Sequence, residues 1–308
     1  MNEEFDIVVA GGGVAGLTAA LTAARLGCKT FVLSGDVLGG LLLSIEKVEG
    51  FPGFVEGVPG YDLCPMIQEQ AVAAGAQFTA ASLDGLERQN GGWLLASGNA
   101  QVRARAVILA TGATLKELGI PGEERLRGKG VSHCASCDAP LVRKQKVAVV
   151  GGGDSALQEA LTLAEFAEQV IILQRGADLT AQAVYRDRVA THPKIEIRFD
   201  TVVEEVLGDG KVGGVRIRDI KGNASTDLEL AAVFVYIGLE PATAFVKTHM
   251  KVDPSGRIPV DAQMRTEQPG VFAAGIARSG SVGRAVASAG DGTVAAITAE
   301  RYLVDGKW

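Results

Sequence analysis

The segment VSHCASCDAP holds two cysteines separated by two residues, Cys134 and Cys137, and an aspartate follows directly at Asp138. Such a pair can work as a redox dithiol, because a thiolate attacks a disulfide sulfur and exchange proceeds through a mixed disulfide. We expect the cysteines to open a short helix before Pro140, where a helix N-terminus lowers a thiol pKa toward neutrality. An acid in the first helical turn is also favoured by the helix dipole, with or without a catalytic role.

The other cysteines and the histidines do not complete a metal site. A zinc site needs two ligands beyond the CxxC pair, and the three histidines of the chain show no ligand spacing. Cys28 and Cys64 lie in apolar surroundings and are interpreted as small core residues. His133 is interpreted as a partly exposed residue without a catalytic role, and the alternative is a titratable neighbour that tunes the thiols. We therefore predict no metal.

Two glycine-rich segments with the same design lie on either side of the cysteine pair. The first begins at Phe5 and reads FDIVVAGGGVAGLTAALTAARLGCKTFVLSG; the second begins at Lys146 and reads KVAVVGGGDSALQEALTLAEFAEQVIILQRG. Each runs from an apolar strand through glycines into a helix and on to a second strand, which is the context that dinucleotide-binding loops require. Glycine lets the backbone approach a pyrophosphate, and the helix N-terminus faces its charge. The sequence therefore predicts two dinucleotide sites.

The segments that follow each glycine-rich unit predict small antiparallel inserts. The pair Gly91–Gly92 is typical of a turn between two alternating strands. A similar section covers residues 195–220. The last part of the chain predicts a strand at 270–274, a glycine-rich loop and a long helix of small residues.

Composition narrows the class of protein. The chain has 308 residues, 47% of them hydrophobic, and a net charge of −6. No basic stripe is present to neutralise the phosphates of a nucleic acid. No apolar stretch approaches the roughly 20 residues that span a bilayer, and two acids precede the first apolar run where a signal peptide would be basic. We expect a cytoplasmic protein without nucleic acid or membrane partners.

The order of these motifs resembles the low-molecular-weight thioredoxin reductases, over essentially the whole chain. The matching segments are GGGVAG (11–16), VEGFPGF (48–54), ILATGA (108–113), GIPGE (119–123), VSHCASCDA (131–139), GGGDSA (151–156), FVYIGLEP (234–241) and PGVFAAG (269–275). The resemblance implies an α/β fold with two Rossmann-like, three-layer ββα nucleotide-binding domains, each with a small antiparallel insert, the second inserted in the first. The FAD-binding domain would comprise residues 1–117 and 247–308, and residues 118–246 would carry the dithiol.

The resemblance also implies an activity and its residues. The chain would be an FAD-dependent dithiol–disulfide oxidoreductase, with Cys137 facing the flavin, Cys134 attacking a partner disulfide and Asp138 protonating the departing thiolate. The flavin site would comprise Gly11, Gly13, Val14, Ala15, Gly16, Ser34, Gly35, Gly39, Gly40, Leu41, Gly50, Thr111, Gly112, Gly275, Ile276, Gly283, Arg284 and Ala285. The second nucleotide site would comprise Gly151, Gly153, Asp154, Ser155, Ala156, Gln174, Arg175 and Gly238.

Both sites depart from the family pattern. Members that use NADPH carry a His-Arg-Arg-x-x-x-Arg motif that clamps the 2′-phosphate, but residues 174–180 here read QRGADLT and keep only Arg175. NADH is not clearly favoured either, because Gln174 stands where an acid would bind the ribose. On the flavin side the residues that differ from the family pattern are Leu41, Gly50, Ile276 and the pair Gly283–Arg284.

The sequence leaves several alternatives for the electron donor and for the disulfide partner. The intact GGGDSA loop and the lost arginines together favour an ADP-bearing group without a 2′-phosphate, such as a second FAD or NADH. NADPH in that site and a ferredoxin as donor are the alternatives. The resemblance implies thioredoxin or a similar small disulfide protein as partner, and a homodimer. The alternatives are a dithiol oxidase that uses oxygen and a redox sensor without turnover. Trp308 is expected to lie in a frayed tail, the alternative being stacking over a flavin or a neighbouring subunit.

Overall fold

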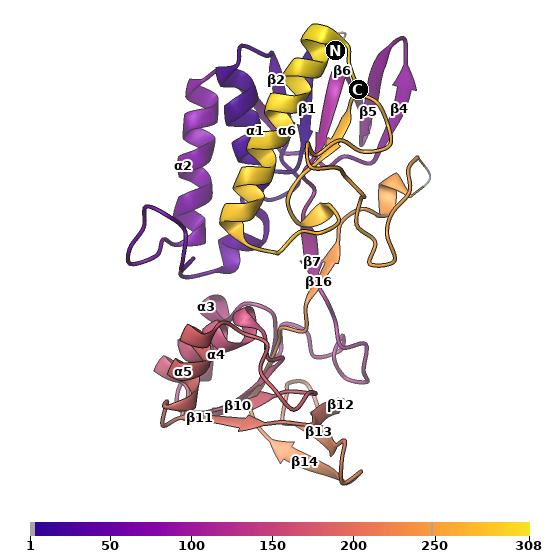
Figure 1. The fold of residues 1–308 in the computed structure, drawn as a ribbon. Helices are drawn as coiled ribbons and strands as arrows, with labels where there is room; N and C mark the ends of the chain where they lie inside the picture. Colours follow the sequence, from indigo (N-terminus) through magenta and orange to yellow (C-terminus); the bar gives the residue numbers. More distant parts are fainter. Residues whose placement is uncertain (1–3, 248) are drawn as a thin grey trace. The chain divides into compact units, whose positions relative to one another are not determined.

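The computed structural model describes residues 4–247 and 249–308, which divide into two units (Figure 1). Unit 1 comprises Met1–Thr114 and Glu240–Trp308, and unit 2 comprises Leu115–Leu239. Unit 2 is thus inserted into unit 1, and the predicted fold class is confirmed. None of the helices in the described ranges is both long and apolar enough to cross a membrane.

A parallel sheet forms the centre of unit 1. Its strands run in the order β3-β2-β1-β6, with β17 beside β6. The bounds are β1 Glu4–Ala10, β2 Thr30–Leu33, β3 Gln77–Thr79, β6 Ala100–Leu109 and β17 Val271–Ala273. The central strands are apolar on both faces, as expected for a parallel sheet that is covered on both sides.

Helices and a hairpin complete unit 1. The helices are α1 Val14–Arg25, α2 Gly60–Ala73 and α6 Ala285–Asp305, with short 3-10 turns at Gly40–Ser44, Ala244–Val246 and Gly275–Ala277. A Cβ at Gly292 would lie 2.1 Å from the Ala15 carbonyl oxygen, so glycine there lets α6 contact α1 closely. The antiparallel strands β4 (Gly85–Gln89) and β5 (Gly92–Ser97) extend the sheet beside β6.

The hairpin turn lies one residue earlier than predicted. Asn90 and Gly91 have φ values of 52° and 82°, while Gly92 is already the first residue of β5. A two-residue hairpin turn of this type needs positive φ at both central residues, and asparagine tolerates that conformation better than most residues. The predicted turn at Gly91–Gly92 therefore becomes a turn at Asn90–Gly91.

Unit 2 repeats the architecture with its own sheet. The parallel strands run in the order β11-β10-β9-β15-β8. Their bounds are β8 Val131–Ser132, β9 Lys146–Val150, β10 Gln169–Leu173, β11 Ile195–Arg198 and β15 Ala232–Val235. The helices are α3 Ala135–Asp138, α4 Asp154–Phe166 and α5 Ala183–Ala190, with a 3-10 turn at Ala139–Val142. The antiparallel insert consists of β12 Thr201–Leu207, β13 Gly214–Asp219 and β14 Ser225–Glu229.

Two chain segments connect the units, and they pair with each other. They form the short strands β7 (Ala113–Leu115) and β16 (Leu239–Pro241). Within unit 2 the Lys116 N–H donates to the Gly238 carbonyl at 3.0 Å, and within unit 1 the Ala242 N–H donates to the Gly112 carbonyl at 3.1 Å. Each unit also has apolar clusters of its own, around α4 and β9 in unit 2 and around α1 and β6 in unit 1.

The C-terminus of the chain is packed rather than frayed. Trp308 meets the rings of Phe272 and Tyr302 edge to face, with centroids 5.1 and 5.3 Å away. Such aromatic pairs contribute about 1 kcal/mol beyond the area they bury. The frayed-tail interpretation of Trp308 is therefore wrong, because the residue packs against the core of its own unit.

Candidate functional site

The two cysteines form a disulfide at the start of α3, which confirms the predicted short helix before Pro140. Strand β8 leads directly into this segment, and Cys134 is the N-cap residue of α3. The Sγ atom of Cys134 accepts the Cys137 N–H at 3.2 Å and lies 3.5 Å from the Ser136 Oγ atom. A thiolate at this position would be stabilised by a helix N-terminal amide, which is how proteins produce reactive thiols.

The side chains around the dithiol differ in exposure. Cys137 is exposed, whereas Cys134 and Asp138 are partly buried. His133 is half-buried, and its Nε2 atom has no hydrogen-bond partner among the described residues. Burial and the nearby Arg127 guanidinium lower the pKa of His133, so this imidazole is neutral at pH 7.

The glycine-rich loop of unit 1 is shaped for a dinucleotide. Gly13 is the N-cap of α1, and a Cβ placed there would have no atom within 4 Å. By contrast, a Cβ on Gly11 would lie 2.1 Å from the Ala110 oxygen, and one on Gly16 would lie 1.9 Å from the Gly11 oxygen. The first turn of α1 therefore opens onto free space with amides that have no intrahelical acceptor, which is the usual setting for a pyrophosphate.

Other predicted flavin residues gather around this loop. The Gly12 N–H donates to the Ser34 carbonyl, and the Gly39 N–H donates to the Gly12 carbonyl. The Oγ1 atom of Thr111, after β6, is buried and has no partner in the described residues. A buried hydroxyl without a partner is costly unless a ligand supplies one. These residues fit FAD.

Four further predicted flavin residues, Gly50, Gly275, Gly283 and Arg284, lie in different surroundings. Gly275 lies against α1, since a Cβ there would be 2.9 Å from the Ala15 Cβ. Gly50 and Gly283 have positive φ values, and a Cβ added to either would have no atom within 4 Å. Arg284 is the N-cap of α6.

Sequence reasoning missed a buried ion pair between Arg278, in the loop after β17, and Asp291 on α6. Asp291 on α6 accepts hydrogen bonds from the Arg278 guanidinium at 2.7 and 2.8 Å and from the Gly275 N–H at 3.1 Å. The side chains of Arg278 and Asp291 are 17% and 8% exposed. The pair holds the loop after β17 against α6. The segment ASAGDG (287–292), which contains Asp291, has no periodicity or spacing that predicts this ion pair.

The second glycine-rich loop is covered by the segment that follows β10. The Gln174 side chain lies over Gly152, where an added Cβ would meet its amide at 2.6 Å, and its Nε2 donates to the Asp178 carbonyl at 2.8 Å. The Thr180 N–H donates to the Gly152 carbonyl. Gly153 is the N-cap of α4 and stays open, because a Cβ added there would be 3.8 Å from its nearest neighbour.

The charged side chains near the second glycine-rich loop do not form the cluster of arginines that binds a 2′-phosphate. Arg175 is exposed, and Asp178 lies three residues further on. Asp154, the first residue of α4, accepts the Gln182 N–H at 2.6 Å and its side-chain amide at 3.2 Å. One arginine and two carboxylates thus replace the cluster of arginines that a 2′-phosphate requires.

Of the two cysteines outside the CxxC pair, Cys64 is buried and Cys28 is partly buried against the core of unit 1. Cys64 is buried, and burial raises the pKa of its thiol to about 11. Burial and the Asp6 carboxylate also raise the pKa of Cys28. Both stay as thiols near neutral pH and are poor nucleophiles.

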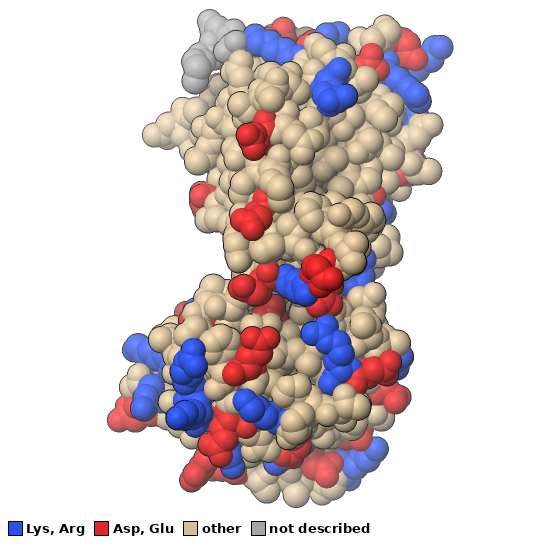
Figure 2. Space-filling model, turned by 90° about the vertical axis from the view of Figure 1, so that its left-hand side faces the viewer, with Lys and Arg blue, Asp and Glu red and all other residues tan. Residues whose placement is uncertain are grey.

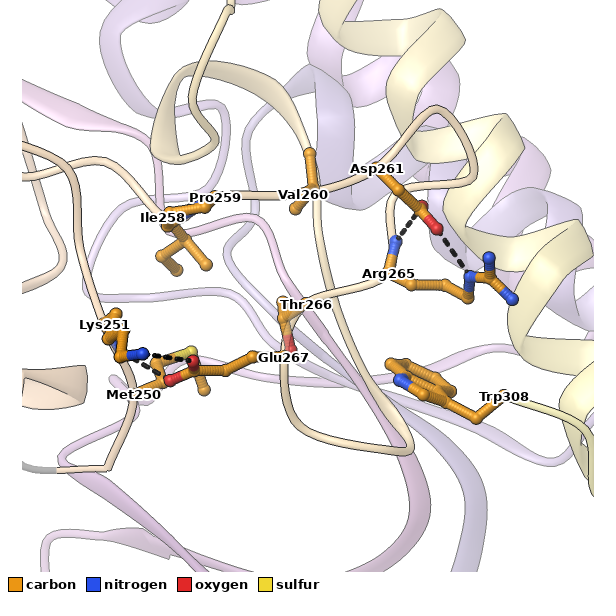
Figure 3. Close-up of a pocket in the computed structure, with 10 residues that line it drawn as sticks. All are labelled: Met250, Lys251, Ile258, Pro259, Val260, Asp261, Arg265, Thr266, Glu267 and Trp308. Atoms are coloured by element: carbon orange, nitrogen blue, oxygen red, sulfur yellow. Dashed lines mark hydrogen bonds and ion pairs between the residues drawn. The ribbon is translucent and has the colours of Figure 1, made fainter.

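A pocket of about 430 Å³ in unit 1 lies away from the predicted site residues (Figure 3). Ion pairs between Asp261 and Arg265 and between Lys251 and Glu267 lie on opposite sides of it. The lining residues are Met250, Lys251, Ile258, Pro259, Val260, Asp261, Arg265, Thr266, Glu267 and Trp308. None of them was predicted as a site residue. Each charged side chain has a partner of opposite sign, so the pocket shows no preference for a charged ligand.

Comparison with known proteins agrees with the geometry. A model of the family described as pyridine nucleotide-disulphide oxidoreductase matches residues 5–292. The thioredoxin reductase of Treponema pallidum is 36% identical over 303 residues, 98% of each chain, and that of Mycolicibacterium smegmatis is 38% identical over 301 residues, 97% of each chain. A crystal structure of Lactococcus lactis thioredoxin reductase in its FR conformation matches with a TM-score of 0.95 at 34% identity, covering 98% of this chain and 99% of that one. The chain therefore belongs to the pyridine nucleotide-disulphide oxidoreductases, and the enzyme that it forms is an FAD-dependent disulfide oxidoreductase.

Proposed function

We propose that the enzyme passes electrons through Cys134 and Cys137 to the disulfide of thioredoxin or a similar small protein. The observation that carries this proposal is the disulfide at the N-terminus of α3, where the Cys137 N–H points at the Cys134 sulfur. Relatives named thioredoxin reductase support the choice of partner. We also place the enzyme in the cytoplasm, since Cys28 and Cys64 are unbridged and a reducing compartment keeps thiols in that form.

The chemistry on the protein is thiol–disulfide exchange. FAD held at the loop of Gly11, Gly13 and Gly16 would, once reduced by the electron donor, supply the two electrons that open the Cys134–Cys137 disulfide into a thiolate and a thiol. The Cys134 thiolate then attacks one sulfur of the partner disulfide, and the partner's other sulfur leaves as a thiolate that takes a proton from Asp138 or water. Finally, the Cys137 thiolate attacks the Cys134 sulfur, releases the second partner thiolate and re-forms the intramolecular disulfide.

The second nucleotide site takes an ADP-bearing ligand that lacks a 2′-phosphate. The covering segment offers one exposed arginine, Arg175, together with the Asp178 carboxylate, while Gln174 is held by its bond to the Asp178 carbonyl. Each missing charged hydrogen bond is worth about 1.5–3 kcal/mol. NADPH should therefore bind at least about tenfold more weakly here than in a site with the full arginine cluster. The Asp178 carboxylate should further disfavour the 2′-phosphate of NADPH relative to NADH. A second FAD in the site would exclude both nucleotides.

Flavin content and donor preference test the proposal together. FAD released from the denatured holoenzyme is counted per chain, and NADH, NADPH and reduced ferredoxin are then offered separately with oxidised thioredoxin. Two FAD per chain, or NADH binding tighter than NADPH, would support the proposed ligand class, and tighter binding of NADPH would contradict it. Free thioredoxin thiols are the expected product. Peroxide formation from a small dithiol under air would instead indicate a dithiol oxidase.

We infer that a second copy of this chain covers the α2 face of unit 1. The solvent side of α2 exposes Tyr61, Met66 and Val72 together with the carboxylates Asp62 and Glu69, and Val55 in the preceding loop is 98% exposed. Figure 2 views the molecule from this side and shows few charged side chains across the middle of unit 1. Exposed apolar surface of this kind marks interaction sites on soluble proteins.

A charge on α2 tests this interface. Met66→Glu should shift the protein from two chains to one in light scattering, because a buried unpaired carboxylate is costly at an interface. Glutamate is a good helix former, so α2 itself should persist. Val304→Glu, at an exposed apolar position near the end of α6, is the matched control and should leave the mass unchanged. Equal masses for both variants and the wild type would contradict the inference.

A further inference from the structure

Tyr236 connects the dithiol helix to the sheet of unit 2. It follows β15, and its N–H donates to the Val150 carbonyl at 2.8 Å. Its ring is buried, with 8% of the residue exposed. Its hydroxyl oxygen accepts a hydrogen bond at 3.0 Å from the Ala135 N–H, which belongs to the residue directly after Cys134.

The Ala135 amide needs an acceptor from outside the helix. Ala135 is the first residue of α3, and first-turn amides have no intrahelical acceptor. An N-cap side chain reaches the amides of the second or third residue, and the Cys134 sulfur is already used by the Cys137 N–H. Because Ala135 is fully buried, water does not replace the missing partner. The Tyr236 hydroxyl supplies it.

This contact fixes the donors that face the Cys134 sulfur. The Cys137 N–H and the Ser136 hydroxyl lie 3.2 and 3.5 Å from that sulfur, and both belong to the short helix that Tyr236 holds. When the disulfide opens, these two groups are close enough to donate to a thiolate on Cys134. A helix of four residues has little rigidity of its own, so its orientation depends on such an external contact.

We propose that Tyr236 is a positioning residue that keeps the Cys134 thiol acidic by holding the N-terminus of α3. The proposal rests on the dithiol as the redox centre and on Cys134 as the attacking thiol. The phenol acts as a neutral group, since burial, followed by the charge of Glu159 on α4 and of Asp138 on α3, raises the pKa of Tyr236 well above its usual range. Titratable groups near Cys134 include His133, which precedes it in the chain, and Asp138, whose N–H donates to the Cys134 carbonyl at 3.2 Å.

The test is Tyr236→Phe in the full-length, FAD-loaded enzyme. Reduced protein is alkylated with iodoacetamide from pH 5 to pH 9, and mass spectrometry measures the rate at Cys134 separately from the other cysteines. We expect the thiolate fraction of Cys134 at pH 7 to fall about three- to tenfold, the equivalent of one hydrogen bond. Disulfide reduction should fall by a similar factor at pH 7 and recover toward pH 9, which a loss of folding would not do.

Tyr185→Phe is the matched control. Tyr185 is 3% exposed, and its hydroxyl donates to Gln158 on α4 rather than to α3. It should leave the alkylation profile of Cys134 unchanged. A wild-type profile in Tyr236→Phe would overturn the proposal, even if turnover with thioredoxin were absent, so failure of the proposed partner is distinguishable.

A measurement on the wild type covers the case in which Tyr236→Phe does not fold. Hydrogen exchange of the Ala135 amide should be slowed at least about tenfold relative to the unstructured rate, as expected for an amide in a persistent hydrogen bond. Exchange at the unstructured rate would show that the contact is not maintained, and it would equally overturn the proposal.

Discussion

A Gly13→Glu variant should fold normally and contain no FAD. Gly13 has an extended backbone, with φ −78° and ψ 177°, that any residue adopts, and a Cβ there meets no atom within 4 Å. The new carboxylate would lie at the N-terminus of α1, where the helix dipole favours an anion. It would therefore occupy the position that a pyrophosphate needs. FAD released per chain on denaturation and the thermal unfolding temperature are the two measurements.

Gly153→Glu is the matched control in the second glycine-rich loop. Gly153 is the N-cap of α4 with nearly the same backbone, φ −91° and ψ −178°. This variant should keep the FAD of unit 1 and lose any nucleotide bound in unit 2. Normal FAD content in Gly13→Glu, or complete loss of FAD in Gly153→Glu, would mean that the cofactor is not assigned to the correct loop.

Replacing either cysteine of the pair should reduce turnover to the level of uncatalysed exchange, because both sulfurs are needed to form and resolve the mixed disulfide. The two variants should differ in what accumulates. Reduced Cys137→Ser should stay covalently linked to the partner through Cys134, because no second thiol is present to release it. Cys134→Ser should form much less of this adduct. Mass spectrometry of the non-reduced mixture distinguishes the two species.

Cys64→Ser provides the control for this pair. Burial raises the pKa of Cys64 to about 11, so its thiol is protonated through the working range, and its contribution to exchange at pH 7–8 is negligible. Turnover per FAD should be retained in this variant. If Cys134→Ser rather than Cys137→Ser trapped the partner, the roles of the two cysteines would be reversed, which the greater exposure of Cys137 would then explain.

Local patterns were sufficient to predict the glycine loops and the dithiol helix. A strand, a glycine turn and a helix lie within about 30 residues of sequence, and a capped helix start depends on immediate neighbours. Both features were therefore visible without tertiary information. The predicted hairpin turn was one residue too late. Gly91 and Gly92 both suit a turn, and only the register of the two strands decides which residues form it.

Contacts between distant segments were not visible in the sequence. The hydroxyl of Tyr236 meets an amide 101 residues earlier, and Arg278 pairs with Asp291 across a loop and a helix. Nothing in the spacing of these residues reports such contacts. Trp308 was misinterpreted for the same reason, since its partners Phe272 and Tyr302 come together only when β17 and α6 are packed. The predicted roles of the individual site residues remain predictions.

The paired connecting segments bring together the chain ends at which each unit begins and ends. The insert begins and ends where Lys116 and Gly238 are joined by one backbone hydrogen bond, and the cut ends of unit 1 are joined in the same way at Gly112 and Ala242. Excising the insert would leave a gap that a tight turn can close, at little cost in chain entropy. Each product would keep its own apolar core and glycine loop. We therefore expect the two units to fold when produced as separate chains, one of them with the loop predicted for the flavin and the other with the dithiol.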